Sequence, residues 1–169
     1  MPDLRPVLFV VGLMIAGLGV TMFIPMMVDL AYKGPTWQVF GISGAISTLF
    51  GAIMALACYA PKASLRARGA FLLTTLSWIA LSVFAAVPLF MADIGLDLTD
   101  SLFEAVSGIT TTGSTVMTGL DDASKGVLIW RAILHTIRTF GLLSRHEKRF
   151  LSANNFTTLK FTQNNITNL

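Results

Sequence analysis

The chain has 169 residues, of which 54% are hydrophobic and only 12% are charged, and its formal net charge is +3. Together with a mean hydropathy of +0.71, this composition excludes an ordinary soluble domain. Its single cysteine, Cys58, excludes a disulfide framework and a cysteine-based metal site. The sequence therefore predicts an integral membrane protein, and the apolar stretches below predict an all-α fold.

The first apolar stretch covers residues 7–28 and carries no charge. At about 1.5 Å per residue it is long enough to cross a hydrocarbon core of about 30 Å. A cleaved signal peptide is the alternative because Arg5 precedes the stretch, but the apolar region is too long and no small-residue cleavage site follows. We expect a retained membrane helix, with small residues that permit close packing at Gly12, Gly17 and Gly19.

Two further apolar stretches, at residues 39–59 and 69–91, predict a second and a third membrane helix. One face of the second carries small residues three or four positions apart, the spacing that lets membrane helices approach closely: Gly41, Gly44, Ser47 and Gly51. The connection at residues 60–69 holds three basic residues and no acid, which marks it as cytoplasmic. We therefore expect the N-terminus in the cytoplasm and the third helix leading outward.

Acidic residues follow the third helix and predict an acidic outer vestibule: Asp93, Asp97, Asp100, Glu104, Asp121 and Asp122. Such a surface raises the local concentration of cations. Ordinary solvated loop charge remains an equal alternative.

Residues 97–118 are the most distinctive part of the sequence. They predict a short helix that starts with a capping box at Ser101 and Glu104 and ends at Gly108. Because this helix is too short to cross a bilayer, we expect it to enter from the outer side and to return there as a re-entrant loop. Irregular backbone at that depth has to be buried in protein or line a watery cavity.

The loop after this helix carries a hydroxyl on every residue but one: Thr110, Thr111, Thr112, Gly113, Ser114 and Thr115. A dehydrated potassium ion needs a ring of oxygens, which backbone carbonyls of an extended segment supply, and glycine permits the dihedral angles that aim them inward. The partly negative C-terminal end of the preceding helix also favours a cation. A polar surface loop is the alternative, and it is the commoner origin of such a run in soluble proteins.

The run at residues 101–121, followed by residues 125–131, resembles the first pore loop of the Trk/Ktr potassium-transporter superfamily, specifically the Trk-type membrane subunit of bacteria. The resemblance covers about residues 1–135 and is most specific after Leu98. It implies four helix-and-filter repeats, each between two membrane helices, around one pore.

By this resemblance, Gly113 falls on the filter glycine, and Thr111, Thr112 and Ser114 fall on its carbonyl-donating neighbours. Potassium would then be bound through Thr111, Thr112 and Gly113, within an ion-binding segment that runs from Thr110 to Thr115. One such segment cannot enclose an ion.

The resemblance also implies potassium uptake across the bacterial inner membrane, with this chain contributing the first of four filter repeats and inactive alone. Its implied partners are the lipid bilayer, a second copy in a homodimer and a cytoplasmic ring of nucleotide-binding regulatory subunits. Potassium is the transported ion, and we expect no cofactor and no nucleic-acid partner. An enzyme is not expected, because the sequence has two histidines and neither a glycine-rich phosphate loop nor a nucleophile elbow.

A last helix is predicted from Gly126, with Trp130 as an interfacial aromatic anchor. It also carries Arg131, His135 and Arg138, and each arginine near a helix centre costs about 2.5–3.5 kcal/mol on insertion. We therefore expect an incomplete fourth membrane helix.

From residue 136 the sequence departs from the family pattern, as after a truncation, a frameshift or a recombination junction. On a helical projection of residues 129–149, basic residues gather on one side, which suggests a helix at the membrane interface: Arg131, His135, Arg138, Arg145 and Arg149. The Asn- and Thr-rich end is predicted to be disordered. The expected organisation is two N-terminal membrane helices in residues 1–61, the first pore repeat in 62–135 and a divergent tail in 136–169.

Two alternatives to the four-repeat transporter stay open. In the first, the chain is a one-filter subunit of a homotetrameric cation channel, since four identical loops close a ring. In the second, it is a non-transporting accessory or remnant membrane protein.

Overall fold

The structure is a computed structural model that describes residues 4–59, 67–118 and 123–136. Its helices are α1 (Arg5–Thr21), α2 (Phe23–Ala31), α3 (Trp37–Ala57), α4 (Ala67–Met91) and α5 (Leu98–Thr110). Residues 125–136 are also helical and are called the 125–136 helix below. The part of the chain that the structure describes contains helices and no strand, which confirms the predicted all-α class.

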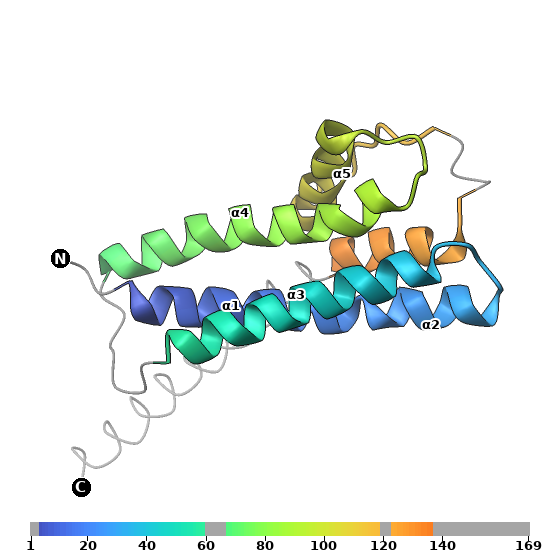
Figure 1. Cartoon of the computed structure of the whole chain (residues 1–169). Helices are drawn as coiled ribbons and strands as arrows, with labels where there is room; N and C mark the ends of the chain where they lie inside the picture. Colours follow the sequence, from blue (N-terminus) through green and yellow to red (C-terminus); the bar gives the residue numbers. More distant parts are fainter. Residues whose placement is uncertain (1–3, 60–66, 119–122, 137–169) are drawn as a thin grey trace, which may run out of the picture.

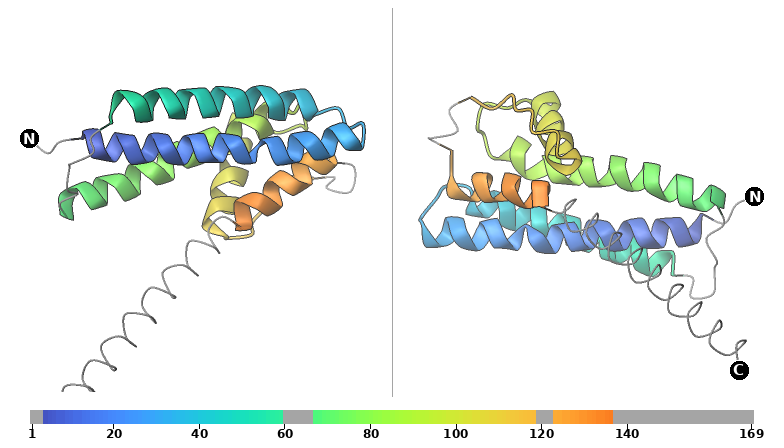
Figure 2. Two further views of the ribbon diagram at one scale, coloured as in Figure 1. Left: turned by 90° about the horizontal axis from the view of Figure 1, so that it is seen from below. Right: turned by 180° about the vertical axis from the view of Figure 1, so that it is seen from behind.

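The long helices lie side by side, and α5 and the 125–136 helix lie against one end of them (Figure 1). The helix pair α1 and α2, together with α3 and α4, forms an elongated bundle, and α5 crosses the end of α4 at a steep angle. Two further views show that the 125–136 helix lies beside α2 and reaches toward α5 (Figure 2). The hydroxyl-rich loop, which is residues 110–118 from here on, connects α5 back toward the start of the 125–136 helix.

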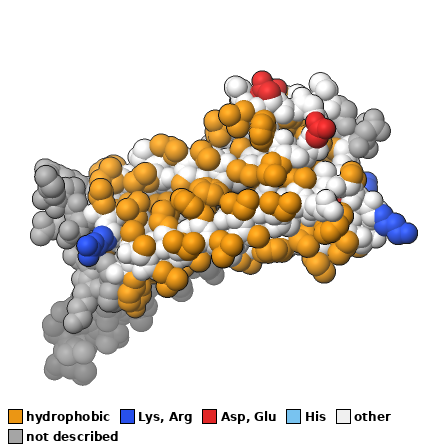
Figure 3. Space-filling model, viewed as in Figure 1, with side chains coloured by type: hydrophobic (Ala, Val, Ile, Leu, Met, Phe, Trp, Pro, Cys, Tyr) orange, Lys and Arg blue, Asp and Glu red, His pale blue; other side chains and the backbone are white. Residues whose placement is uncertain are grey.

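Three helical stretches are long and apolar enough to cross a membrane, Arg5–Ala31, Trp37–Ala57 and Phe71–Met91. This confirms the three predicted spans. Hydrophobic side chains cover the flank of the long helices, while Lys and Arg side chains lie toward the two ends of the bundle and carboxylates lie where α5 begins (Figure 3). Such a distribution is typical of a bundle surrounded by lipid.

The first span is not one straight helix, because α1 and α2 meet at Met22. Pro25 explains the break: it has no amide to donate to the carbonyl one turn earlier, and its ring crowds that carbonyl. The predicted first span, residues 7–28, is confirmed, and the break at Met22 lies inside it.

The closest helix packing is between α1 and α3, and it depends on glycines. A Cβ atom at Gly12 would lie 2.8 Å from the backbone of Ala55 and Gly51, and one at Gly19 would lie 2.6 Å from the amide of Thr48. The predicted small-residue packing is thus confirmed for these glycines. Gly17 differs, since a Cβ atom there would meet no described atom within 4 Å.

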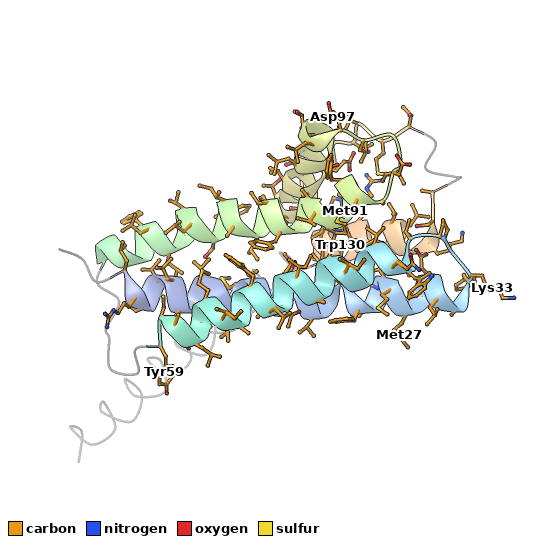
Figure 4. All side chains as sticks on the ribbon, viewed as in Figure 1. Met27, Lys33, Tyr59, Met91, Asp97 and Trp130 are labelled. Carbon is orange, nitrogen blue, oxygen red and sulfur yellow. The ribbon has the colours of Figure 1, made fainter. Side chains whose placement is uncertain are left out.

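A second packing centre joins α3, α4 and the 125–136 helix around Trp130. This side chain is fully buried, its ring packs edge-on against Phe40 at 6.3 Å, and its indole N–H donates to the carbonyl of Ala85 at 3.1 Å (Figure 4). The prediction of an interfacial anchor is therefore wrong. Trp130 is a core residue, because the bundle offers its N–H an acceptor within α4.

Several predictions fall outside the described residues. They are the basic cytoplasmic connection, Asp121 and Asp122, and the interfacial and disordered segments after residue 136.

Candidate functional site

The helix α5 starts earlier than the sequence suggested. Asp97 is its N-cap, with an extended backbone and a side chain that accepts the Asp100 amide at 2.8 Å, at the end of α5 far from α1 and α3 (Figure 4). The predicted capping box at Ser101 and Glu104 is wrong. Both residues lie inside the helix and are buried, because Asp97 offers an equally good cap one turn earlier and Glu104 has other partners.

The C-terminal end of α5 turns sharply at Thr111. The Thr111 amide donates to the Gly108 carbonyl and the Thr112 amide donates to the Ser107 carbonyl, both at 3.0 Å, while Thr111 has φ 56° and ψ 30°. This pair of bonds is a Schellman motif, whose left-handed position usually holds glycine. The predicted end at Gly108 is wrong because Gly108 is instead pressed against the 125–136 helix, where a Cβ atom would lie 2.9 Å from Leu134.

A threonine in the left-handed region is strained, since its branched Cβ crowds the backbone. Two residues later Gly113 has φ 78°, which glycine adopts without that strain. The predicted filter glycine therefore does occupy a position that favours glycine.

The structure places the predicted ion-binding residues together in one short bend. Thr110 is half-buried and the other five, Thr111 to Thr115, are exposed on the described chain. Hydrogen bonds within the bend hold its shape: the Ser107 hydroxyl donates to the Ser114 carbonyl at 2.6 Å, and the hydroxyls of Thr110 and Thr112 lie 2.7 Å apart. The bend thus turns the chain back along α5, while re-entry into a membrane stays a prediction.

The return segment of the loop is held by Glu104. One carboxylate oxygen, Oε1, accepts the Thr115 hydroxyl and the amides of Val116 at 2.7 Å and Met117 at 3.2 Å. These amides belong to irregular backbone with no helical ladder to satisfy them, so a charged acceptor is a strong substitute. Glu104 is therefore not one of the exposed carboxylates that the vestibule prediction requires, whereas Asp93 and Asp97 are exposed and the vestibule itself stays a prediction.

The second oxygen of Glu104 pairs with Arg131 on the 125–136 helix. The distance from Arg131 Nη2 to Glu104 Oε2 is 3.1 Å, and the two side chains are 16% and 2% exposed. The sequence argument counted Arg131 as a cost against membrane insertion. In the structure this charge is paired with Glu104. The insertion cost assigned to an unpaired Arg131 therefore does not count against a fourth helix.

Another buried carboxylate lies where the first two spans are joined. Asp29 is fully buried; it accepts the Thr36 hydroxyl and, at 2.6 Å, the amide of Gly126. The sequence analysis did not single out Asp29, and it assigned Glu104 to a cap. The signal that was available is the position of each acid directly beside apolar residues, which predicts a buried partner.

The described residues contain no group of three or more His, Cys, Asp or Glu side chains that would hold a metal ion. What the bend offers is neutral oxygen, from backbone carbonyls and hydroxyls. Such oxygens bind dehydrated alkali cations when several segments surround the ion.

Comparison with known proteins identifies the family. A family model for TrkH, described as a cation transport protein, matches residues 36–146. The chain belongs to the TrkH family. The match runs past His135, where the sequence resemblance was expected to end.

TrkH-family relatives match most of this chain. The Trk system potassium uptake protein TrkI of Halomonas elongata is 36% identical over 138 residues, which is 82% of this chain and 28% of the relative. TrkG of Escherichia coli is 36% identical over 143 residues, 82% of this chain and 29% of that protein. These relatives are transporters, not enzymes.

The crystal structure of the potassium transporter TrkH from Vibrio parahaemolyticus has the same fold over the matched part. The TM-score is 0.74 at 33% identity, covering 79% of this chain and 29% of that one. This confirms a TrkH-type membrane fold. The chain spans less than a third of the length of the relatives it matches.

Proposed function

We propose that this chain supplies one filter segment, residues 110–115, of a potassium-uptake pathway in the bacterial inner membrane. The observation that supports it best is the bend at Thr111 and Gly113, which a Ser107–Ser114 hydrogen bond closes and behind which Glu104 holds the return segment. This arrangement costs free energy, because the bend holds a strained residue and the ion pair behind it is desolvated, and a simple connection between helices needs neither. It is what an ion path needs, since carbonyl oxygens have to stay aimed at the ion.

The kind of ligand supports an alkali cation, and potassium itself is taken from the family resemblance. Neutral carbonyl and hydroxyl oxygens can replace the hydration shell of an alkali cation, whereas protein sites for divalent ions usually include carboxylates. Thr111, Thr112 and Gly113 are the residues proposed to contact potassium. One segment provides a quarter of the shell, so three further segments complete it.

The proposed topology has the N-terminus in the cytoplasm, α4 leading outward and α5 re-entering from outside. Residues 1–61 then form an N-terminal helix pair, and residues 62–135 form the first repeat. A homodimer and a nucleotide-binding regulatory ring belong to the proposal through the family resemblance.

The test is rubidium uptake, as a potassium tracer, by vesicles that contain a chimera. Residues 1–136 of this chain replace the matching first part of the Vibrio parahaemolyticus transporter. Gly113→Ala is expected to lower uptake roughly tenfold or more, because alanine at positive φ strains and shifts the bend. The matched control is Gly95→Ala, since Gly95 also has positive φ, 76°, with no described atom within 4 Å of a Cβ atom, but lies outside the loop.

The proposal predicts uptake by the chimera, loss with Gly113→Ala and retention with Gly95→Ala. It is contradicted if the chimera reaches the membrane in normal amount yet takes up no rubidium, or if both alanine variants transport equally well. Vesicles with the isolated chain are expected to stay at background. Selective uptake by the isolated chain that Gly113→Ala abolishes would replace the four-repeat arrangement with the homotetramer.

A further inference from the structure

Among the residues that the structure describes, Asp29 and Glu104 are the buried acids, and the proposed filter chemistry does not use Asp29. It lies at the end of α2 and is fully buried, although both neighbours in sequence are apolar. A buried carboxylate is costly unless its oxygens are hydrogen-bonded. Its partners therefore show what it does.

Asp29 caps the 125–136 helix, through an amide that lies 97 residues later in the chain. Its Oδ1 accepts the Gly126 amide at 2.6 Å, in the first turn of the 125–136 helix. Ser124 is the local cap of the same helix: its carbonyl accepts the Leu128 amide at 3.2 Å and its hydroxyl oxygen accepts the Val127 amide at 3.3 Å. The negative charge of Asp29 also lies at the partly positive end of this helix.

The hydroxyl hydrogens fix the direction of the remaining bonds. Thr36 donates its single hydroxyl hydrogen to Asp29, so in the 2.7 Å contact between Thr36 and Ser124 the hydrogen comes from Ser124. Asp29, Thr36 and Ser124 thus form one network that joins the α2–α3 turn to the 125–136 helix.

Two glycines leave space for this carboxylate. A Cβ atom at Gly126 would lie 2.6 Å from the Asp29 carboxyl carbon, and one at Gly34 would lie 2.8 Å from Oδ1. A larger residue at either position displaces Asp29. The contact can therefore be broken without mutating Asp29 itself.

The 125–136 helix connects this cap to the hydroxyl-rich loop. Arg131 lies in the same helix and pairs with Glu104, which holds the amides of Val116 and Met117. Leu134 lies against Gly108 at the end of α5. Because the first turn of this helix is fixed, the position of the Arg131 guanidinium relative to Glu104 is fixed as well.

We propose that Asp29 is a positioning residue for the filter segment, acting through the 125–136 helix. That the loop is a filter rests on the proposed function. The link from Asp29 to the loop does not, because it is made by contacts within the folded chain. By holding the start of that helix, Asp29 fixes where Arg131 meets Glu104 and so fixes the return segment of the loop.

The experiment is hydrogen–deuterium exchange of the full chain in lipid vesicles. Asp29→Ala is expected to speed exchange about tenfold or more at two places, the start of the 125–136 helix and the peptide that contains Val116 and Met117. Gly126→Ala is expected to speed exchange at the same two places, because its methyl group displaces the Asp29 carboxylate. Asp29→Asn should restore slow exchange, since its Oδ1 still accepts the Gly126 amide and the hydroxyl bonds can reverse.

The matched control is Asp97→Ala, which removes an aspartate cap that acts only on α5. It is expected to speed exchange at the start of α5 and to leave the 125–136 helix unchanged. Peptides from α3 report whether each variant is folded.

Three outcomes decide the proposal. Faster exchange at both places with Asp29→Ala and Gly126→Ala, and rescue by Asp29→Asn, supports it. Faster exchange confined to residues 124–128 overturns the positioning role and leaves a local cap, and unchanged exchange overturns the cap as well. None of these readouts depends on potassium transport, so failure of the proposed function would show separately, in the rubidium assay.

Discussion

The α1–α3 pair and the α5 loop region are held together in opposite ways. Between α1 and α3 the contacts are backbone against backbone, at glycines where a Cβ atom has no room. Around α5 they are hydrogen bonds and an ion pair that converge on Glu104. In a membrane, apolar surface gives helices no preference for each other over lipid, so regular helices need close approach, whereas irregular backbone needs polar partners.

The largest effect is expected from removing the polar centre of the loop region. Glu104→Ala leaves the Val116 amide and the Arg131 charge without the acceptor that Glu104 provides, while the Met117 amide keeps the Thr115 hydroxyl oxygen at 3.1 Å. It should lower the free energy of unfolding by about 3–5 kcal/mol. Equilibrium unfolding of the detergent-solubilised chain measures this.

Glu104→Gln is the matched variant for that prediction. It keeps an Oε1 acceptor but loses the ion pair, so its effect should be clearly smaller. Equal loss in the two variants would show that the charge, rather than the hydrogen bonds to the loop, dominates.

A smaller effect is expected from adding a methyl group between α1 and α3. A Cβ atom at Gly51 would meet the backbone nitrogen of Ala16 and, at 2.6 Å, the carbonyl of Gly12. Gly51→Ala should therefore destabilise the chain by about 1–3 kcal/mol in the same unfolding experiment. Gly17→Ala, where the space is open, should stay within about 0.5 kcal/mol, and a similar loss there would refute the packing argument.

The smallest effect is expected at Thr111, with the opposite sign. Thr111→Gly removes a branched side chain from a left-handed backbone and should raise the free energy of unfolding by about 1 kcal/mol. Thr112 has no positive φ, so Thr112→Gly should lower stability instead, by about 0.5–1 kcal/mol. If both glycines change stability in the same direction, the strain assigned to Thr111 is absent.

Local pattern was enough to predict the three membrane spans and an unusual backbone at Gly113. Length of apolar sequence decides a span, and a glycine in a run of hydroxyl residues marks an unusual backbone, so neither depends on distant contacts. The glycines of α1 and α3 were likewise visible as a spacing.

The roles of Glu104 and Trp130 could not be predicted in this way. Whether Glu104 caps its own helix or holds a loop depends on Asp97 and on Arg131, and the latter arrives from a separate helix. Trp130 is buried because Ala85 in α4 offers a carbonyl across 45 residues of sequence. Local rules favoured a cap and an interfacial anchor, and tertiary contacts overrode both.

The bonds that shape the hydroxyl-rich loop have a consequence for assembly. Those described above come from Ser107, Glu104 and the loop itself, all within one polypeptide. The entropy lost in ordering this backbone is therefore incurred while the chain folds, not when segments meet around an ion. The loop of this chain therefore has its final form before it meets any further segment.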